Sequence, residues 1–346
     1  MPSARLEDYD LGAVLGVGTV GTIYSATRRQ PTGDAKFDRV AIKRLHPAIS
    51  RDPLIRARFR REMTILERLG HPHIVAYHGG GEADGQLYYI MELVDGGTVK
   101  EILESSGPLP WPVVVEITRQ ICSALQCAHN HGVIHRDLKP GNLFLTRDAQ
   151  VKLGDFGIAR DLHGGDLTAQ GMTVGTHAYM PPEQITGSQD ISGKSDLYSL
   201  GCCLFELLTG RKPFIAEDFA HLFDQHLRAD PPSVRRAGSD CPEELDELIR
   251  QLMAKRPEDR PFNARQVQGV MLQLGERYGL GDPDGGGEAG GDVGAAHVTL
   301  VGRRLLEKQI HARLQGPVRE DVGWLRLGLL VAGLIAFAVL AAMSTR

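Results

Sequence analysis

Cysteine is scarce in this chain of 346 residues, and its spacing excludes a disulfide-stapled scaffold. The five cysteines form no CxxC pair and no regular framework. Cys202 and Cys203 are adjacent within an apolar run, so we expect buried free thiols and a reducing compartment.

An excess of positive charge is also missing. Lys and Arg number 39 against 43 Asp and Glu, a net charge of −4, which gives no support to a nucleic-acid partner. The first residues, MPSARLEDYD, contain no apolar segment, so we predict no signal peptide. Hydrophobic residues make up 42% and charged residues 24%, as in globular proteins, and the length fits two domains or one two-lobed domain.

Long hydrophobic runs are absent until residues 327–343, where seventeen residues carry no charge. As a helix this run would be about 26 Å long, and counting from Trp324 brings it close to a membrane thickness of about 30 Å. A buried core helix is the alternative, but apolar residues cover all of its faces. We therefore predict a transmembrane helix at 324–343. Six basic residues at 301–326 precede it and only Arg346 follows, which predicts a single-pass protein with its N-terminal bulk in the cytoplasm.

A glycine-rich stretch separates this run from the body of the chain. Residues 281–296 contain seven glycines and four acidic residues, so we predict a flexible, then basic, juxtamembrane linker at 281–323. Within it, 303–314 has apolar residues at helical spacing among basic ones. This segment could lie on an anionic membrane, pair with a partner helix, or act as a plain spacer.

The body changes from strand patterns to helix patterns along its length. We expect strands at 11–14, 21–26, 40–44 and 87–92, with one helix at 56–69. We expect helices at 113–130, 195–209, 217–228, 243–254 and 263–277. A β-rich first part followed by a helical second part predicts an α+β fold with two lobes.

Chemistry-bearing motifs begin with the glycines of GVGTVG, residues 16–21, which lie between two predicted strands. A strand-like sequence follows them, so we interpret the motif as a hairpin whose backbone amides approach phosphates. Lys43 ends the apolar strand VAIK, where a charge is costly unless it is paired. Glu62, in the predicted helix, is the expected partner.

The stretch HRDLKPGN, residues 135–142, concentrates charged and amide groups. We expect Asp137 to orient an incoming hydroxyl and Lys139 to neutralise charge on a transferring phosphoryl group. Asn142 and Asp155 offer one amide oxygen and one carboxylate, a donor set that suits Mg²⁺ together with waters and phosphate oxygens.

Together these motifs resemble the eukaryotic-type (Hanks-type) protein kinases, in a compact form typical of bacteria. The glycines, VAIK, a helix Glu, HRDLKPGN, DFG at 155–157 and PPE at 181–183 occur in the family's order. The resemblance covers about 9–275 and implies a bilobal kinase fold, with an N-lobe at 9–94 and a C-lobe at 95–275. It implies a protein kinase with ATP and Mg²⁺ as cofactors and Mn²⁺ as an alternative metal. A scaffold that binds nucleotide without turnover is the alternative. Such proteins usually lose the equivalents of Lys43, Asp137 or Asp155, and this chain keeps all three.

The resemblance also implies roles for individual residues. Lys43, held by Glu62, would anchor the ATP phosphates beneath Gly16, Gly18 and Gly21. The residues expected around the adenine are Leu15, Ile23, Ala41, Met91, Glu92, Val94 and Phe144. Two structural ties are also implied: Glu183 with Arg260, and Asp196 with the catalytic loop.

Specificity and regulation follow from the same resemblance. Lys139 two residues after Asp137, and the segment 175–183, are typical of Ser/Thr kinases, with Thr176 bridging Asp137 and Lys139; dual specificity is an alternative. A phosphate on Thr168 or Thr173 could dock on Arg136 and order the loop. The expected partners are ATP, protein substrates with Ser or Thr, the membrane and a transient homodimer for phosphorylation in trans.

Overall fold

The computed structural model describes residues 4–18, 20–156, 177–188, 190–281 and 300–315. The chain divides into two compact units, 1–311 and 312–346, and only 312–315 of the second are described. Both lobes belong to the first unit. Among the described residues, no helix is long and apolar enough to cross a membrane, and the predicted span at 324–343 lies outside them.

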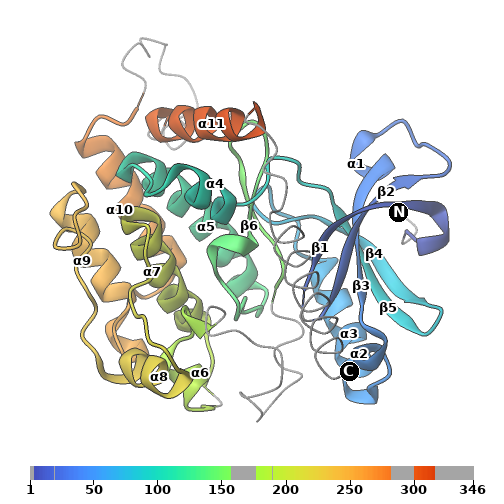
Figure 1. Ribbon diagram of the computed structural model, residues 1–346, viewed down its shortest axis with the longest axis horizontal. Coiled ribbons are helices and arrows are strands. Elements are labelled where there is room, and N and C mark those ends of the chain that lie inside the picture. The colour runs from blue at the N-terminus through green and yellow to red at the C-terminus, as the bar shows by residue number, and fades with distance from the viewer. Residues whose placement is uncertain (1–3, 19, 157–176, 189, 282–299, 316–346) are drawn as a thin grey trace, which may run out of the picture. The chain divides into compact units, whose positions relative to one another are not determined.

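The N-lobe is built on one antiparallel sheet (Figure 1). Its elements are β1 (Tyr9–Val17), β2 (Gly21–Arg28), α1 (Ala35–Asp38), β3 (Arg39–Leu45), α2 (Pro47–Ser50), α3 (Pro53–Leu66), β4 (Tyr77–Ala83) and β5 (Gln86–Glu92). The five strands run in the order β1-β2-β3-β5-β4. Side chains alternate between two small cores, with Ile42 and Ile90 on one face and Leu45 and Tyr89 on the other.

The C-lobe is helical. Its elements are α4 (Val99–Ser106), α5 (Trp111–Asn130), β6 (Leu143–Leu145), β7 (Val151–Leu153), α6 (Pro182–Ile185), α7 (Gly193–Thr209), α8 (Phe219–Arg228), α9 (Glu243–Leu252), α10 (Ala264–Arg277) and α11 (Leu300–Gln315). One large core joins these helices, and Cys202 and Cys203 are fully buried in it as free thiols, as predicted. The two-lobed α+β prediction is confirmed.

The predicted strands and helices miss seven elements, namely α1, α2, β4, α4, β6, β7 and α6, and one segment differs from its description as a linker. β4 contains three glycines, which hid its strand pattern. α4 begins at a capping box in which Thr98 and Glu101 bond each other's backbone amides, a signal that the sequence carried as TVKE. Helix α11 lies inside the predicted linker, and its apolar face is buried against the C-lobe core.

Candidate active site

Strand register gathers several predicted residues on one face of the N-lobe sheet. Ile23 is opposite Lys43, and Ala41 is opposite Met91, across neighbouring strands. Because side chains alternate along a strand, Lys43 and Ala41 point to the same face, and their partners join them there. Leu15, near the end of β1, is about half exposed.

Lys43 makes an ion pair that links β3 to the segment after β7. Its Nζ lies 2.6 Å from Oδ1 of Asp155, 112 residues later in the chain. Burial would raise the pKa of Asp155, but the charge and hydrogen bond of Lys43, together with the charge of Lys139 and His135, hold that pKa below its usual value. The backbone of Glu62 belongs to α3, while its side chain lies outside the described residues, so its expected pairing with Lys43 stays a prediction.

The catalytic loop forms a compact cluster of polar side chains. Lys139 Nζ donates to Asp137 Oδ2 at 2.7 Å. Asn142 Nδ2 donates to the carbonyl and to Oδ2 of Asp137, at 2.7 and 3.2 Å. Because the amide nitrogen of Asn142 is committed to Asp137, its Oδ1 is the atom that remains to meet a cation. The backbone amide of Gly154, next to Asp155, donates to the Asn142 carbonyl at 3.1 Å, which ties the two predicted metal ligands together.

Buried groups brace this loop from below. The carboxylate of Asp196, which is 1% exposed, accepts hydrogen bonds from the backbone amides of His135 and Arg136, both at 2.9 Å. It also lies 2.7 Å from Nε2 of the His129 ring. Arg136 has a φ of 63° and Asp155 a φ of 53°, conformations that cost a non-glycine residue free energy unless contacts enforce them. The predicted bracing role of Asp196 is confirmed.

His135 connects the catalytic loop to the segment that carries Asp155. Its Nδ1 faces the backbone amide of Asp137 at 3.3 Å, and its Nε2 faces the carbonyl of Gly154 at 2.9 Å. The first contact requires an accepting Nδ1 and the second a donating Nε2, which fixes the tautomer of this fully buried ring.

Glu92, the residue after Met91, forms an ion pair with Lys152 that sequence reasoning missed. Lys152 of β7 contacts both carboxylate oxygens of Glu92, at 2.9 and 3.0 Å, and the backbone amide of Ala76 donates to Oε2 at 3.0 Å. The side chains of Lys152 and Glu92 are only 12% and 21% exposed.

Phe144, opposite Lys152 in the β6–β7 hairpin, lies where a side chain on Gly154 would collide with it. Val94 follows β5 in a half-buried stretch without regular secondary structure.

The glycines of the first motif have different physical reasons. A Cβ on Gly21 would lie 2.2 Å from the carbonyl oxygen of Arg44, so packing alone demands glycine there. A Cβ on Gly16 would meet nothing within 4 Å, and one on Gly18 only a backbone oxygen at 3.7 Å. Packing in the described structure therefore does not explain these two glycines, and their predicted role near phosphates stays a prediction. The ring of His46 also bonds the Gly18 carbonyl at 3.0 Å.

Glu183 and Arg260 form the predicted structural tie. Two parallel hydrogen bonds of 2.7 and 2.9 Å join the guanidinium to the carboxylate, and Ser195 donates to the same carboxylate at 2.6 Å. The predicted regulatory residues at 168, 173 and 176 lie outside the described residues.

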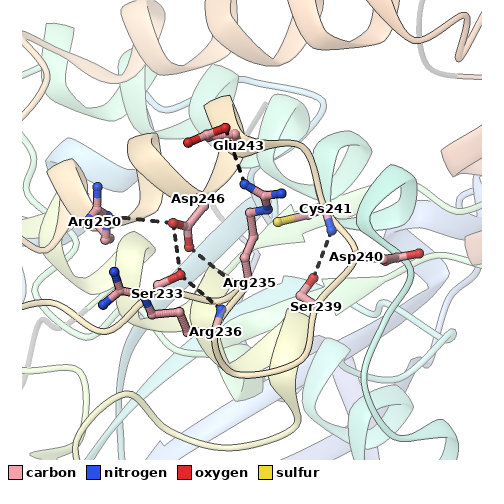
Figure 2. Close-up of a pocket in the computed structure, with 9 residues that line it drawn as sticks. All are labelled: Ser233, Arg235, Arg236, Ser239, Asp240, Cys241, Glu243, Asp246 and Arg250. Atoms are coloured by element: carbon pink, nitrogen blue, oxygen red, sulfur yellow. Dashed lines mark hydrogen bonds and ion pairs between the residues drawn. The ribbon is translucent and has the colours of Figure 1, made fainter.

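An open polar cavity of about 530 Å³ lies next to α9, away from these residues (Figure 2). Asp246 accepts the backbone amide of Val234 at 2.7 Å and faces Arg250 at 3.7 Å, while Arg235 pairs with Glu243 at 3.4 Å. The charges around it are largely paired with each other, and none of the predicted site residues lines it. We assign it no part in the candidate site.

Comparison with known proteins decides the family. The protein kinase domain matches residues 9–269. The chain belongs to the protein kinase family. It is 38% identical over 282 residues to the serine/threonine-protein kinase PknB of Mycolicibacterium smegmatis, covering 80% of this chain and 44% of that protein. It is 39% identical over 276 residues to the serine/threonine-protein kinase PknH of Mycobacterium bovis, with the same coverages.

Solved structures agree with this kinase fold. The Mycobacterium tuberculosis PknI kinase domain gives a TM-score of 0.62 at 29% identity, covering 80% of this chain and 99% of that one. Rad53 residues 1–466 in complex with AMP-PNP gives 0.64 at 28% identity, with coverages of 75% and 64%. The chain spans less than half the length of the curated relatives that it matches.

Proposed function

We propose that this chain is a serine/threonine protein kinase that transfers the γ-phosphoryl group of ATP to protein hydroxyls. The 2.6 Å ion pair between Lys43 and Asp155 carries the proposal, because it joins the VAIK strand to the DFG segment. Asp137, Lys139 and Asn142 complete the group through direct hydrogen bonds. The serine/threonine-protein kinases PknB and PknH align with 80% of this chain, which supports serine and threonine as the acceptor residues.

The residues present fit ATP and a divalent metal. Gly16 and Gly18 leave backbone uncovered where phosphates would lie, and Lys43 brings an ammonium to the same face of the sheet. Asn142 Oδ1 and Asp155 would hold Mg²⁺ or Mn²⁺. The metal, when bound, neutralises charge on the phosphates. Rad53, a structural neighbour at 28% identity, is described in complex with AMP-PNP, which supports a nucleotide ligand.

The chain's own groups would orient the acceptor. Asp137 would accept a hydrogen bond from the substrate hydroxyl and aim its oxygen at the phosphorus. Lys139, 2.7 Å from that carboxylate, would neutralise the developing charge on the transferring group. Asn142 fixes the orientation of Asp137 from its other side. Catalysis would then consist of positioning and charge stabilisation, without a covalent intermediate.

The adenine would lie against the sheet face described above. Ile23, Ala41 and Phe144 would contact the ring, with Leu15 and Met91 at its edges. The backbone at Glu92 and Val94 would supply its hydrogen bonds. The ion pair between Glu92 and Lys152 would keep that backbone in place.

The decisive experiment incubates the full-length chain with radiolabelled ATP, Mg²⁺ and a generic acceptor protein. We expect label on serine and threonine, and Asp137→Asn to reduce the rate by about a hundredfold or more, as for loss of a catalytic acid or base. Asp218→Asn, an exposed carboxylate that caps α8, is the matched control. Equal incorporation by wild type and Asp137→Asn would reject the proposal, and label on tyrosine would show dual specificity.

We further propose self-activation by phosphorylation of the loop at Thr168 or Thr173, with Arg136 as the docking cation, in trans within a transient homodimer. Mass spectrometry of the protein expressed with and without Asp137→Asn would test this. Phosphate at either threonine only in the active protein is expected; its presence in both excludes self-modification.

Membrane anchoring through 324–343, with the catalytic domain cytoplasmic, is also proposed from the uncharged run. Wild type should remain in the membrane fraction after alkaline carbonate washing. Leu330→Arg combined with Leu334→Arg should release it, since each charge at a membrane centre costs about 2.5–3.5 kcal/mol. Release of wild type would reject the anchor.

A further inference from the structure

Helix α11 lies beyond the part of the chain that matches the protein kinase domain, which ends at residue 269. Leu306 and Ile310, one turn apart, are fully buried in the C-lobe core. A Cβ on Gly302 would lie 2.2 Å from the carbonyl oxygen of Pro112 in α5, so only glycine allows this approach. The apolar face of α11 is thus already occupied by its own chain.

A second contact joins α11 to the turn between β6 and β7. Arg303 donates through Nε and Nη2 to the carbonyl oxygen of Asp148, at 3.3 and 3.1 Å. The Asp148 carboxylate lies 3.7 Å from the same guanidinium. The turn is therefore gripped by a side chain from a helix some 150 residues further along the chain.

A buried polar network of α5 also holds this turn. Glu116, 1% exposed, accepts two hydrogen bonds from Arg119 and one from Gln120 at 2.6 Å. Gln120 in turn donates to the Ala149 carbonyl at 3.2 Å and accepts the Val151 amide at 2.6 Å. The Cβ of Glu116 would lie 3.0 Å from a Cβ on residue 302, so α11 helps to cover this network.

The open end of the hairpin carries the proposed metal ligands. Asn142 directly precedes β6, and Asp155 follows β7 by two residues. We propose that α11 is a positioning element of the active site: it covers Glu116, grips the Asp148 turn, and so fixes the hairpin that presents Asn142 and Asp155. This inference rests on the proposed kinase function.

The test uses full-length variants. Arg303→Ala removes the grip but leaves the buried face of α11 unchanged, and Gly302→Leu forces α11 away from Pro112. Arg304→Ala, the neighbouring and more exposed arginine, is the matched control. The first readout is hydrogen exchange of peptides spanning 143–153 without nucleotide or metal. The second is the Mg²⁺ concentration needed for half-maximal activity.

We expect Arg303→Ala to speed exchange in 143–153 and to raise the Mg²⁺ requirement roughly threefold to tenfold, as couplings through packed networks do. Arg304→Ala should change neither. Unaltered exchange in both Arg303→Ala and Gly302→Leu overturns the inference, as does faster exchange with an unchanged Mg²⁺ requirement. An inactive wild type would reject the proposed function instead, and the exchange measurement would still show whether α11 holds the hairpin.

Discussion

Removing the guanidinium of Arg260 should be among the most destabilising single changes in the C-lobe. Its side chain is 0% exposed and makes five hydrogen bonds: two to Glu183 and three to the carbonyls of Lys194, Ala254 and Lys255. Arg260→Met keeps much of the volume but leaves a buried carboxylate without its cation. Breaking one side of a buried pair costs about 3–5 kcal/mol, so we expect the free energy of unfolding to fall by that amount.

Urea unfolding followed by circular dichroism measures this loss. The double variant Glu183→Leu with Arg260→Met should recover a large part of it, because no unpaired charge remains. Asp259→Asn, a neighbouring exposed change, should leave stability within about 0.5 kcal/mol. A loss below about 1 kcal/mol in Arg260→Met, typical of a surface pair, would refute the reasoning.

The same pair predicts a pH dependence. Burial would raise the pKa of Glu183, but the hydrogen bonds and charge of Arg260 hold it below the usual value. A carboxyl with a lowered folded pKa contributes stability above its unfolded pKa and loses it as pH falls through the folded pKa. The difference between wild type and Arg260→Met should therefore shrink on acidification.

Three further predictions concern other parts of the two lobes. Gly21→Ala should lower the melting temperature, because its Cβ would lie 2.2 Å from a β3 carbonyl, whereas Gly16→Ala, in open space, should not; equal melting of the two variants contradicts this. Lys152→Met should raise the KM for ATP about twofold to fivefold by freeing Glu92, and an unchanged KM in steady-state assays would exclude that role. Burial lowers the pKa of His73 from its ordinary 6.5 to about 4. On acidification the unfolded chain therefore binds a proton at a higher pH than the folded protein does, so the free energy of unfolding should fall as pH drops from 6.5 to about 4. His73→Asn should flatten that slope in urea titrations; an identical slope would refute it.

The fold could be predicted because most of the longer strands and helices have a local pattern. β4 escaped because glycines mask alternation, and α4 because its capping signal was overlooked. Lys43 shows the limit of pairing arguments, since the sequence suggested Glu62 and did not point to the 2.6 Å ion pair with Asp155. The contact with Asp155 joins two segments 112 residues apart, so only the arrangement of the lobes reveals it.

Contacts between distant segments were the least predictable. Lys152 could not be assigned to Glu92 from the sequence, because both lie on ordinary short strands 60 residues apart. For α11, spacing gave a helix with one apolar face but not its partner. Gly302 is the residue that indicated close packing of this helix, since a glycine inside a helical pattern often marks a close approach of another segment, here the Pro112 carbonyl.

The left-handed backbone at Arg136 and Asp155 has a consequence for engineering. Each conformation disfavours an L-residue by about 1 kcal/mol or more, a penalty that glycine escapes. Substituting glycine at 155 would relieve torsional stress while deleting the carboxylate. The same substitution would leave Lys43 without the carboxylate that it contacts at 2.6 Å, so stability measured at this position reports on backbone strain and on the ion pair together.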